Sequence, residues 1–251
     1  MVWLRSTRLL WILSTTLLFF STNTWSTNNS AELNAAAEMG NLPLVRKILE
    51  TAAFEQGELN VALFTAVQKG NPEIVRRILD AGADVNFRAS NDYTSLIQAA
   101  HDGRHFIAEI LLAANADVNA VAAAADNNTA LTLAAEKNRR EVVAQLLAAN
   151  ADVEVTISNG MTALMLAAQE GHHFVIQALT NAQANVNYAL ENGATALMFA
   201  IQHGHYNSVY ALIVAKADLN VEAANGMTPL KLAGLYRYSE IIKLLKDAGA
   251  K

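Results

Sequence analysis

Residues 162–194 read TALMLAAQEGHHFVIQALTNAQANVNYALENGA, and this stretch decides the fold because it is one copy of a repeat. Its opening Thr162-Ala163-Leu164 returns 33 residues later as Thr195-Ala196-Leu197, and again as Thr228-Pro229-Leu230. Earlier starts stand at Ala31, Val61, Thr94 and Thr129. The later copies share a small-residue pair, a Gly-x-x-x-Val segment and a closing Ala-Asp-Val-Asn, or relatives of these. One such unit cannot bury its apolar face alone, so consecutive units must stack.

Residues at fixed positions of the repeat predict two helices followed by a turn. Thr162 and Thr228 are of the type that caps a helix N-terminus, and Pro229 follows at the first helical position, where a missing N–H costs nothing. Asn159-Gly160 supplies the positive φ of a tight turn between units. Alanine pairs such as Ala167-Ala168 let helices of neighbouring units approach closely.

This pattern of T-x-L, A-A, G-x-x-x-V and A-D-V-N at a 33-residue period resembles the ankyrin repeat family. The resemblance covers residues 31–251 and implies an all-α ankyrin-repeat solenoid of about seven helix-turn-helix units with β-turn fingers. The expected units are residues 31–60, 61–93, 94–128, 129–161, 162–194, 195–227 and 228–251.

The sequence departs from the family pattern in three ways. The histidine that usually follows T-P-L and joins adjacent units is replaced, so we expect packing to join them instead; the residues at this position are Ile97, Thr132, Met165, Met198 and Lys231. Gln183 and Lys216 stand where a left-handed glycine is usual after the second helix, which predicts local strain. The loop Val121–Asn128 is two residues longer than its relatives, as a tolerated insertion or as a finger adapted to a partner.

The first thirty residues differ in composition from the repeats, since none of the 47 alanines precedes position 31. Arg5 and Arg8 precede a twelve-residue apolar stretch at 9–20 and a small polar tail, the three parts of a secretory signal peptide. We expect residues 1–26 to be a signal peptide, or alternatively an uncleaved anchor, and residues 27–30 to be a linker. Cleavage leaves 16 basic and 23 acidic residues, and hence a net charge of −7.

Composition and motifs argue against several classes of function. The absence of cysteine excludes disulfides, thiolate catalysis and cysteine zinc sites. A net charge of −5 argues against nucleic-acid binding. The histidines His101 and His203 fall in units far apart in the stack and cannot share an ion. Nucleophile and phosphate-loop motifs are missing. We therefore expect no catalytic residues, no metal and no cofactor.

Ankyrin proteins typically bind other proteins through their finger tips and the concave face formed by the first helices. Carried over by position, this implies the partner-binding residues Asn91, Tyr93, His101, Asp102, Asn128, Glu136, Lys137, Met161, Gln169, Glu170, Asn192, Gln202, His203, Met227 and Tyr236. Tyr93, Met161, Met227 and Tyr236 are the expected anchors, because hot spots favour aromatic and adaptable side chains. The acidic residues among them favour a partner with a neutral to basic surface.

The sequence thus predicts an exported, non-enzymatic protein that binds another protein as a monomer. The alanine-rich array, the lack of cysteine and the short leader favour the bacterial periplasm or secretion. Two alternatives stay open at this point: a membrane-anchored scaffold that keeps its leader, and an inhibitor or immunity protein that neutralises an enzyme or toxin.

Overall fold

The structure is a computed structural model that describes residues 29–251 of the chain. The described residues divide into two compact bodies, residues 29–87 and residues 88–251, which we call the N-terminal and C-terminal bodies. The described residues are helical, and their only β-pairing is a set of isolated bridges in the fingers, so the predicted all-α class is confirmed. None of the helices in this described part is long and apolar enough to cross a membrane.

The N-terminal body contains a helix over residues 29–38, followed by α2 (Leu42–Thr51), α3 (Gln56–Lys69) and α4 (Pro72–Asp80). Residues 29 and 30, which belong to the segment predicted as a linker at 27–30, form the start of this helix. Helix α3 begins five residues before the predicted boundary at 61, since Glu55 and Glu58 form a capping box there. Residues 52–55 alone join α2 to α3, so this repeat lacks a finger.

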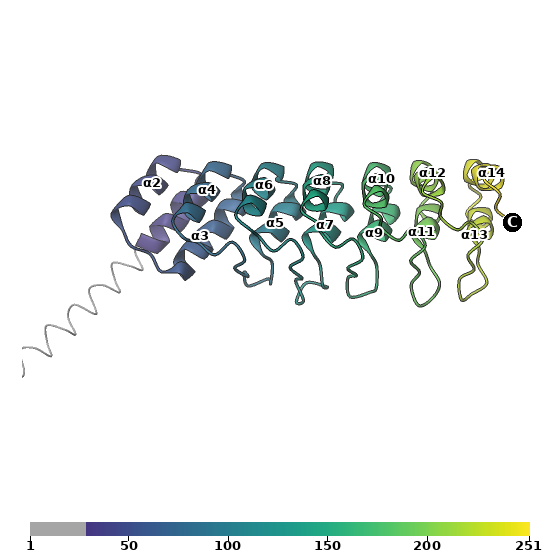
Figure 1. Ribbon diagram of the computed structural model, residues 1–251, viewed down its shortest axis with the longest axis horizontal. Helices are drawn as coiled ribbons and strands as arrows, with labels where there is room; N and C mark the ends of the chain where they lie inside the picture. Colours follow the sequence, from purple (N-terminus) through teal and green to yellow (C-terminus); the bar gives the residue numbers. More distant parts are fainter. Residues whose placement is uncertain (1–28) are drawn as a thin grey trace, which may run out of the picture. The chain divides into compact units, whose positions relative to one another are not determined.

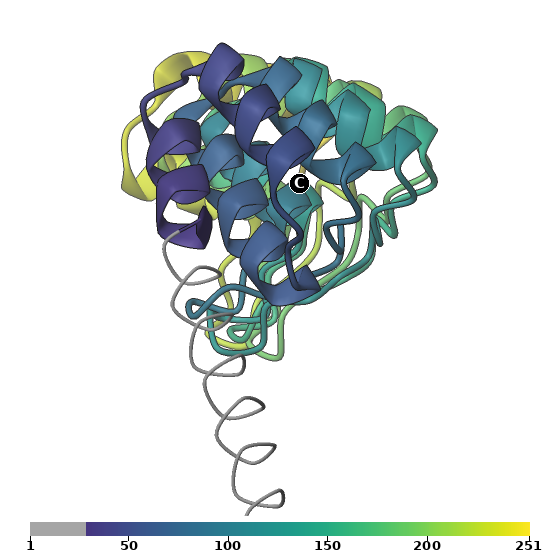
Figure 2. The ribbon, with the colours of Figure 1, turned by 90° about the vertical axis from the view of Figure 1, so that its left-hand side faces the viewer.

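The C-terminal body consists of five helix pairs. Its first helices are α5 (Ser95–Asp102), α7 (Ala130–Glu136), α9 (Ala163–Gln169), α11 (Ala196–Gln202) and α13 (Pro229–Leu235). Its second helices are α6 (His105–Ala113), α8 (Arg140–Ala148), α10 (His173–Asn181), α12 (Tyr206–Val214) and α14 (Ser239–Asp247). Each set forms a row of neighbours, and the loops between pairs hang below the first helices as fingers (Figure 1). Seen along the row, these loops gather on one side of the helices (Figure 2).

The first helices of these pairs begin where the threonine N-caps of the sequence predict. Thr162 and Thr228 accept hydrogen bonds from the backbone N–H groups of Met165 and Lys231, as N-caps do. The alanine pairs predicted to lie between repeats are fully buried, at positions 99–100, 134–135 and 167–168. Small side chains at these positions therefore set the close spacing of the first helices.

Hydrogen bonds as well as packing join adjacent repeats, so the expectation of packing alone is wrong. Arg139 Nε donates to the His101 carbonyl over 3.1 Å. His172 Nε2 lies 2.9 Å from the Glu136 carbonyl, and His205 Nε2 lies 2.9 Å from that of Gln169. Because carbonyls only accept, each ring nitrogen is the donor. In these three repeats, the N-cap residue of the second helix thus joins its repeat to the end of the preceding first helix.

A second set of bonds runs through the Ala-Asp-Val-Asn closures. The Asn119 side chain accepts from the Asp152 N–H over 2.8 Å, and the Asn187 side chain accepts from the Asp218 N–H over 2.8 Å. Glu154 does the same for Asn185 over 2.7 Å. The last residue of each of these three closures thereby satisfies a backbone donor of the following repeat.

Left-handed backbone occurs where the sequence predicted it. Gln183 and Lys216 have φ values of 70° and 65°, so the predicted strain after the second helix is confirmed. Asn138 and Arg237 also have positive φ, at 57° and 60°, and occupy the glycine position of the Gly-x-x-x-Val segment. The leader predicted over residues 1–26 lies outside the described residues.

Candidate functional site

The predicted partner-binding residues all lie in the C-terminal body, on the fingers and on the carboxyl ends of the first helices. We call the exposed or half-exposed members the finger surface: Asn91, Tyr93, His101, Asp102, Asn128, Glu136, Lys137, Gln169, Glu170, Asn192, Gln202, His203, Met227 and Tyr236. These side chains reach the solvent, so a partner can contact them.

Met161 does not belong to this surface, and its predicted role as an exposed anchor is wrong. Its exposed fraction is 6%, because the finger folds back and turns the residue before the N-cap inward. Ile157 N–H donates to the Met161 carbonyl over 2.9 Å, and the Asn159 side chain accepts from the Met161 N–H over 3.0 Å. Met227 holds the same position in the last finger and is only partly buried.

One group of predicted residues forms an acidic cluster around a tyrosine. Lys137 Nζ donates to Glu136 Oε1 over 2.8 Å, and this bond, with the Glu136 and Glu170 charges, raises the pKa of Lys137. Burial, followed by the nearby Glu136 and Asp126 charges, raises the pKa of Tyr93. The charges that act on Tyr93 and Lys137 come from three carboxylates and from the cations Lys137 and Arg139, so the carboxylates are in excess in this cluster.

A second group of predicted residues lines an uncharged hollow of about 260 Å³ between the last two fingers and α11 and α13. Its lining is Asn192, Ala194, Met198, Gln202, Ala223, Ala224, Asn225, Met227 and Leu232. Met198, Met227 and Leu232 provide apolar surface, while Asn192, Gln202 and Asn225 provide amides. Met198 and Leu232 were not predicted as binding residues, because they lie within the first helices α11 and α13 rather than at their ends. This chemistry suits an apolar side chain that carries a neighbouring hydrogen-bonding group.

A neighbouring hollow of about 480 Å³ lies between two fingers. It is lined by Ser158, Asn159, Gly160, Tyr188, Leu190, Glu191 and Asn192. Asn192 contributes to both hollows, so a bound chain that passes this residue can occupy them in succession.

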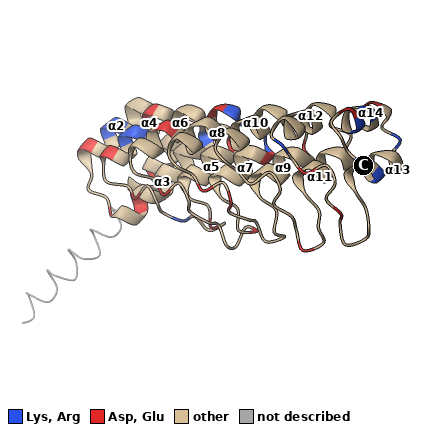
Figure 3. Cartoon of the chain, turned by 45° about the vertical axis from the view of Figure 1, so that its right-hand side comes forward, with Lys and Arg blue, Asp and Glu red and all other residues tan. Residues whose placement is uncertain are grey.

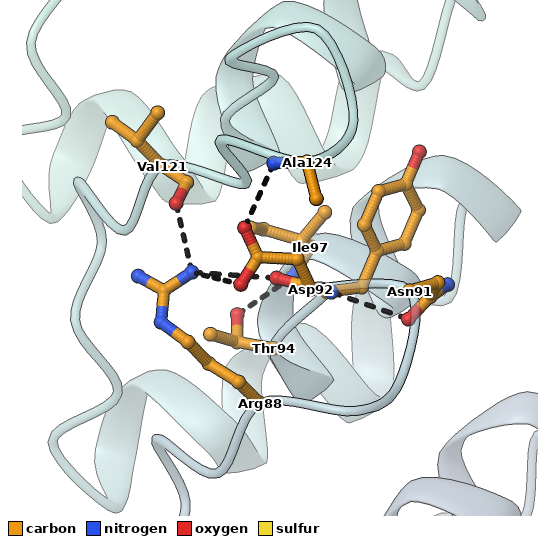
Figure 4. A network of polar contacts seen from close by, with 8 residues as sticks. Arg88, Asn91, Asp92, Thr94, Ile97, Val121 and Ala124 are labelled. Atoms are coloured by element: carbon orange, nitrogen blue, oxygen red, sulfur yellow. Dashed lines mark hydrogen bonds and ion pairs between the residues drawn. The ribbon is translucent and has the colours of Figure 1, made fainter.

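The long loop Val121–Asn128 is attached to the preceding finger by a charged pair (Figure 4). Arg88 Nη1 donates to the Val121 carbonyl over 2.8 Å and lies 3.1 Å from Asp92 Oδ1. Asp92 Oδ2 accepts from the Ala124 N–H over 3.1 Å. This bond, helped by Arg88, lowers the pKa of Asp92. The inserted residues are therefore held in place by the neighbouring finger.

Comparison with protein families decides the assignment. The family model for ankyrin repeats in three copies matches residues 33–122, 63–157, 121–189 and 180–251. The chain belongs to the ankyrin repeat family. It is 39% identical over 92 residues to ankyrin repeat and KH domain-containing protein mask-1 of Caenorhabditis elegans, and 40% identical over 72 residues to ankyrin repeat and SAM domain-containing protein 6 of Rattus norvegicus. These alignments cover 35% and 27% of this chain, but only 4% and 8% of the relatives.

Two solved ankyrin domains share the architecture. The ankyrin repeat domain of Bcl-3, a member of the IkappaB protein family, matches with a TM-score of 0.75 and 28% identity, covering 86% of this chain and 97% of that domain. An ankyrin repeat domain from Acinetobacter baumannii matches with a TM-score of 0.70 and 31% identity, covering 75% of this chain and 98% of that domain. The predicted solenoid is therefore confirmed.

The remaining residues of the ankyrin finger surface already have partners within the protein. His101 Nδ1 lies 2.8 Å from Asp102 Oδ1, and the Asn128 amide donates to the Ala125 carbonyl over 2.8 Å. His203 Nδ1 lies 3.0 Å from the Phe199 carbonyl of its own helix. Tyr236 stacks on Tyr238 with ring centroids 5.7 Å apart. These contacts hold the side chains in defined orientations before any partner binds.

The sequence interpretation missed exposed aromatic residues on the second helices of these ankyrin repeats. Phe106, Phe174, Tyr206 and Tyr210 are all exposed there, and the Arg140 guanidinium lies 4.1 Å from the Phe174 ring centroid. Alignment of the repeats contains the signal, because Phe174 stands where α8 and α14 carry Glu141 and Glu240. An apolar residue at a position where other repeats carry a charged residue indicates a surface that is distinct from the finger surface.

Proposed function

We propose that this ankyrin repeat protein is an exported, non-enzymatic module that binds another protein through its finger surface. The observation that carries the proposal is the pairing of the acidic cluster around Tyr93 with the uncharged hollow beside Met227 on one array. The two features differ in chemistry and lie on different repeats, so together they can select a partner by both charge and shape.

The two features together indicate the chemistry of the partner. Glu136, Glu170 and Asp126 favour a basic side chain near Tyr93. The hollow takes an uncharged side chain against Met198 and Met227. We therefore expect the partner to present a neutral to basic surface that also carries an exposed apolar residue.

Site-directed crosslinking tests this proposal. A photoreactive amino acid at Gln202, on the finger surface, is expected to give a discrete crosslinked product in the native cell. The same amino acid at Glu109, an exposed position of α6, is the matched control and is expected to give none. Replacing Tyr93 and Met227 together by Ala should weaken the interaction at least about tenfold, or ~1.4 kcal/mol. Equal crosslinking from both positions would contradict the proposed site.

Export rests on the leader pattern of residues 1–26 and has its own test. The N-terminus of the native protein is measured by mass spectrometry after cell fractionation. A start near Thr27 outside the cytoplasm supports export, whereas an intact Met1 in the membrane fraction supports the anchored scaffold instead.

A further inference from the structure

Three fingers of the C-terminal body carry an Asn-Gly pair: Asn159-Gly160 before α9, Asn192-Gly193 before α11 and Asn225-Gly226 before α13. In such a pair the backbone nitrogen of the glycine easily reaches the side-chain amide of the asparagine, because glycine has no side chain in the way. All three asparagines are exposed to water. The fingers therefore contain the groups for a chemical change that needs no enzyme.

The reaction is deamidation through a cyclic imide. The glycine nitrogen bonds to the asparagine Cγ and loses its proton, while the bond from Cγ to the amide nitrogen breaks and ammonia leaves. Water then opens the ring at either carbonyl and leaves aspartate or isoaspartate, so that one water is consumed for each ammonia released. The first step needs a free glycine N–H and a carboxamide that can turn towards it.

Two hydrogen bonds oppose this step within each finger. The Gly226 N–H donates to the Ala223 carbonyl over 2.8 Å, and Asn225 Oδ1 accepts from the Met227 N–H over 3.1 Å. The fingers of the other two pairs repeat these bonds over 2.8 Å and 3.0 Å. The attacking nitrogen is engaged and the carboxamide is fixed in each closed finger, so the tip must open before it can react.

The tip that contains Asn192 is also held by the finger that follows it. The Ala224 N–H donates to the Asn192 carbonyl over 2.9 Å, so the reacting peptide group is itself bonded to the next finger. Gly193 lies so close to that finger that an added Cβ atom would be 2.8 Å from Ala223 Cα. Opening this tip therefore breaks a third hydrogen bond and separates two backbones in contact.

The tip that contains Asn225 lacks this cover within residues 29–251. No backbone N–H of these residues donates to the Asn225 carbonyl, and a Cβ atom added at Gly226 would approach only Glu222 of the same finger, at 3.5 Å. Lys231 Nζ donates to the Gly226 carbonyl over 2.8 Å, but that carbonyl belongs to the next peptide group. This bond therefore leaves the attacking nitrogen and the carboxamide unrestrained.

We propose that Asn225-Gly226 is a site of spontaneous deamidation in the folded protein, and that the following finger protects Asn192-Gly193 from the same reaction. Asn159-Gly160 is intermediate. Its asparagine carbonyl accepts no backbone bond from the described residues, but Leu190 Cδ2 would lie 3.2 Å from a Cβ atom added at Gly160. The expected order of rates is Asn225, then Asn159, then Asn192.

Deamidation at this site changes the charge of the hollow beside Met227. Asn225 lines that hollow, and its product carries a carboxylate. The fingers already carry acidic residues among uncharged ones, red among tan in Figure 3, and Glu222 is one of them. An aged molecule thus presents an acidic hollow that favours a basic side chain. The effect on a partner rests on the proposed function, whereas the modification itself does not.

Mass spectrometry of the purified protein during incubation at neutral pH tests the proposal, with fragment ions assigning each deamidated asparagine. Each rate is divided by the rate of the same site in the chain unfolded in guanidinium, which removes the influence of the preceding residue. The ratio at Asn225 should exceed that at Asn192 at least about fivefold, as expected for one net backbone hydrogen bond. A ratio no higher at Asn225, or a folded chain that stays intact there after the unfolded one has reacted, would overturn the proposal.

Ala224→Pro tests the protection by the following finger. Ala224 is the second residue of the turn that the Gly226 N–H closes on the Ala223 carbonyl, a position that favours proline, so the variant removes the N–H and keeps the turn. Deamidation at Asn192 should become about fivefold faster. Asn159 is the internal control and should keep its rate, and circular dichroism should show an intact fold. An Asn192 rate that stays unchanged, or that rises together with the Asn159 rate, would overturn the proposed protection.

Discussion

Lys216 is a single residue whose backbone conformation lowers the stability of the protein. It follows α12 with a φ of 65°, a left-handed conformation in which a Cβ atom meets its own backbone. The equivalent positions Gly82 and Gly249 carry glycine, which has no such cost. Lys216→Gly is therefore expected to stabilise the protein by about 1 kcal/mol and to raise the melting temperature by ~2–4 °C.

Thermal unfolding followed by circular dichroism checks this, since the three tryptophans all lie in the first 25 residues. Lys216→Ala is the control, because it shortens the side chain but keeps the Cβ atom, and it should give no gain. A melting temperature that rises equally in both variants would assign the effect to the lysine charge instead.

His172 is expected to stabilise the array through one hydrogen bond. Its Nε2 donates to the Glu136 carbonyl of the preceding repeat over 2.9 Å. His172→Ala leaves that half-buried carbonyl without this donor, so the free energy of unfolding in denaturant should fall by about 1 kcal/mol. His203→Ala is the matched control: its ring contacts a carbonyl of its own helix and should change stability by less than ~0.5 kcal/mol.

The residue type alone predicts some of these roles but not others. Threonine before a helix and lysine in a glycine position have local meaning, so the caps and the strain at Gln183 and Lys216 are predictable. Arg139 and His172 share only an N–H donor, and their acceptors are backbone carbonyls 38 and 36 residues away. Backbone carbonyl acceptors of this kind cannot be identified from a sequence pattern. The burial of Met161 is hidden for the same reason, since it depends on how the finger folds back.

At the scale of elements, the finger attached by Asp92 is expected to depend on pH. The Ala124 N–H, and then Arg88, lower the pKa of Asp92, so both contacts favour the ionised carboxylate. Their contribution is present above the ordinary aspartate value of 3.8 and is lost as pH falls through the lower folded value. The NMR shift of the Ala124 amide should therefore titrate with a midpoint below 3.8.

Asp92→Asn provides the control for this titration, because the amide keeps an acceptor oxygen and loses the charge. The Ala124 resonance should then no longer titrate in this range. A midpoint at or above 3.8 in the native protein would show that the finger does not hold the carboxylate in solution.

The repeat pattern predicts the elements well where each position carries its usual residue. The helix pairs from α5 to α14 follow the Thr-x-Leu starts, and the last three fingers contain the Asn-Gly pairs. The prediction fails at α3, because residues 52–55 replace the Ala-Asp-Val-Asn closure and let the helix begin at Gln56. It also misses the exposed aromatic residues of the second helices, since the family pattern directs attention to fingers and first helices.

At the scale of the whole molecule, burial changes along the C-terminal body. Helix α9 buries six consecutive residues, Ala163–Ala168, because a repeat packs on each side of it. The last first helix, α13, buries only Pro229 and Ala233. Since the stability of a repeat array is close to a sum over neighbouring interfaces, the last repeat should open most easily.

Amide hydrogen exchange is expected to show this gradient, with the fastest exchange in α13 and α14 and the slowest in α7 to α11 among the helices of this body. Arg237→Gly sharpens the test, because Arg237 is left-handed at 60° between the two terminal helices. Removing that strain should slow exchange in α13 and α14 by up to about fivefold, or ~1 kcal/mol, and leave α7 to α11 unchanged. Uniform exchange across all five pairs would instead mean that the body opens as one cooperative unit, in which case Arg237→Gly would slow every helix alike.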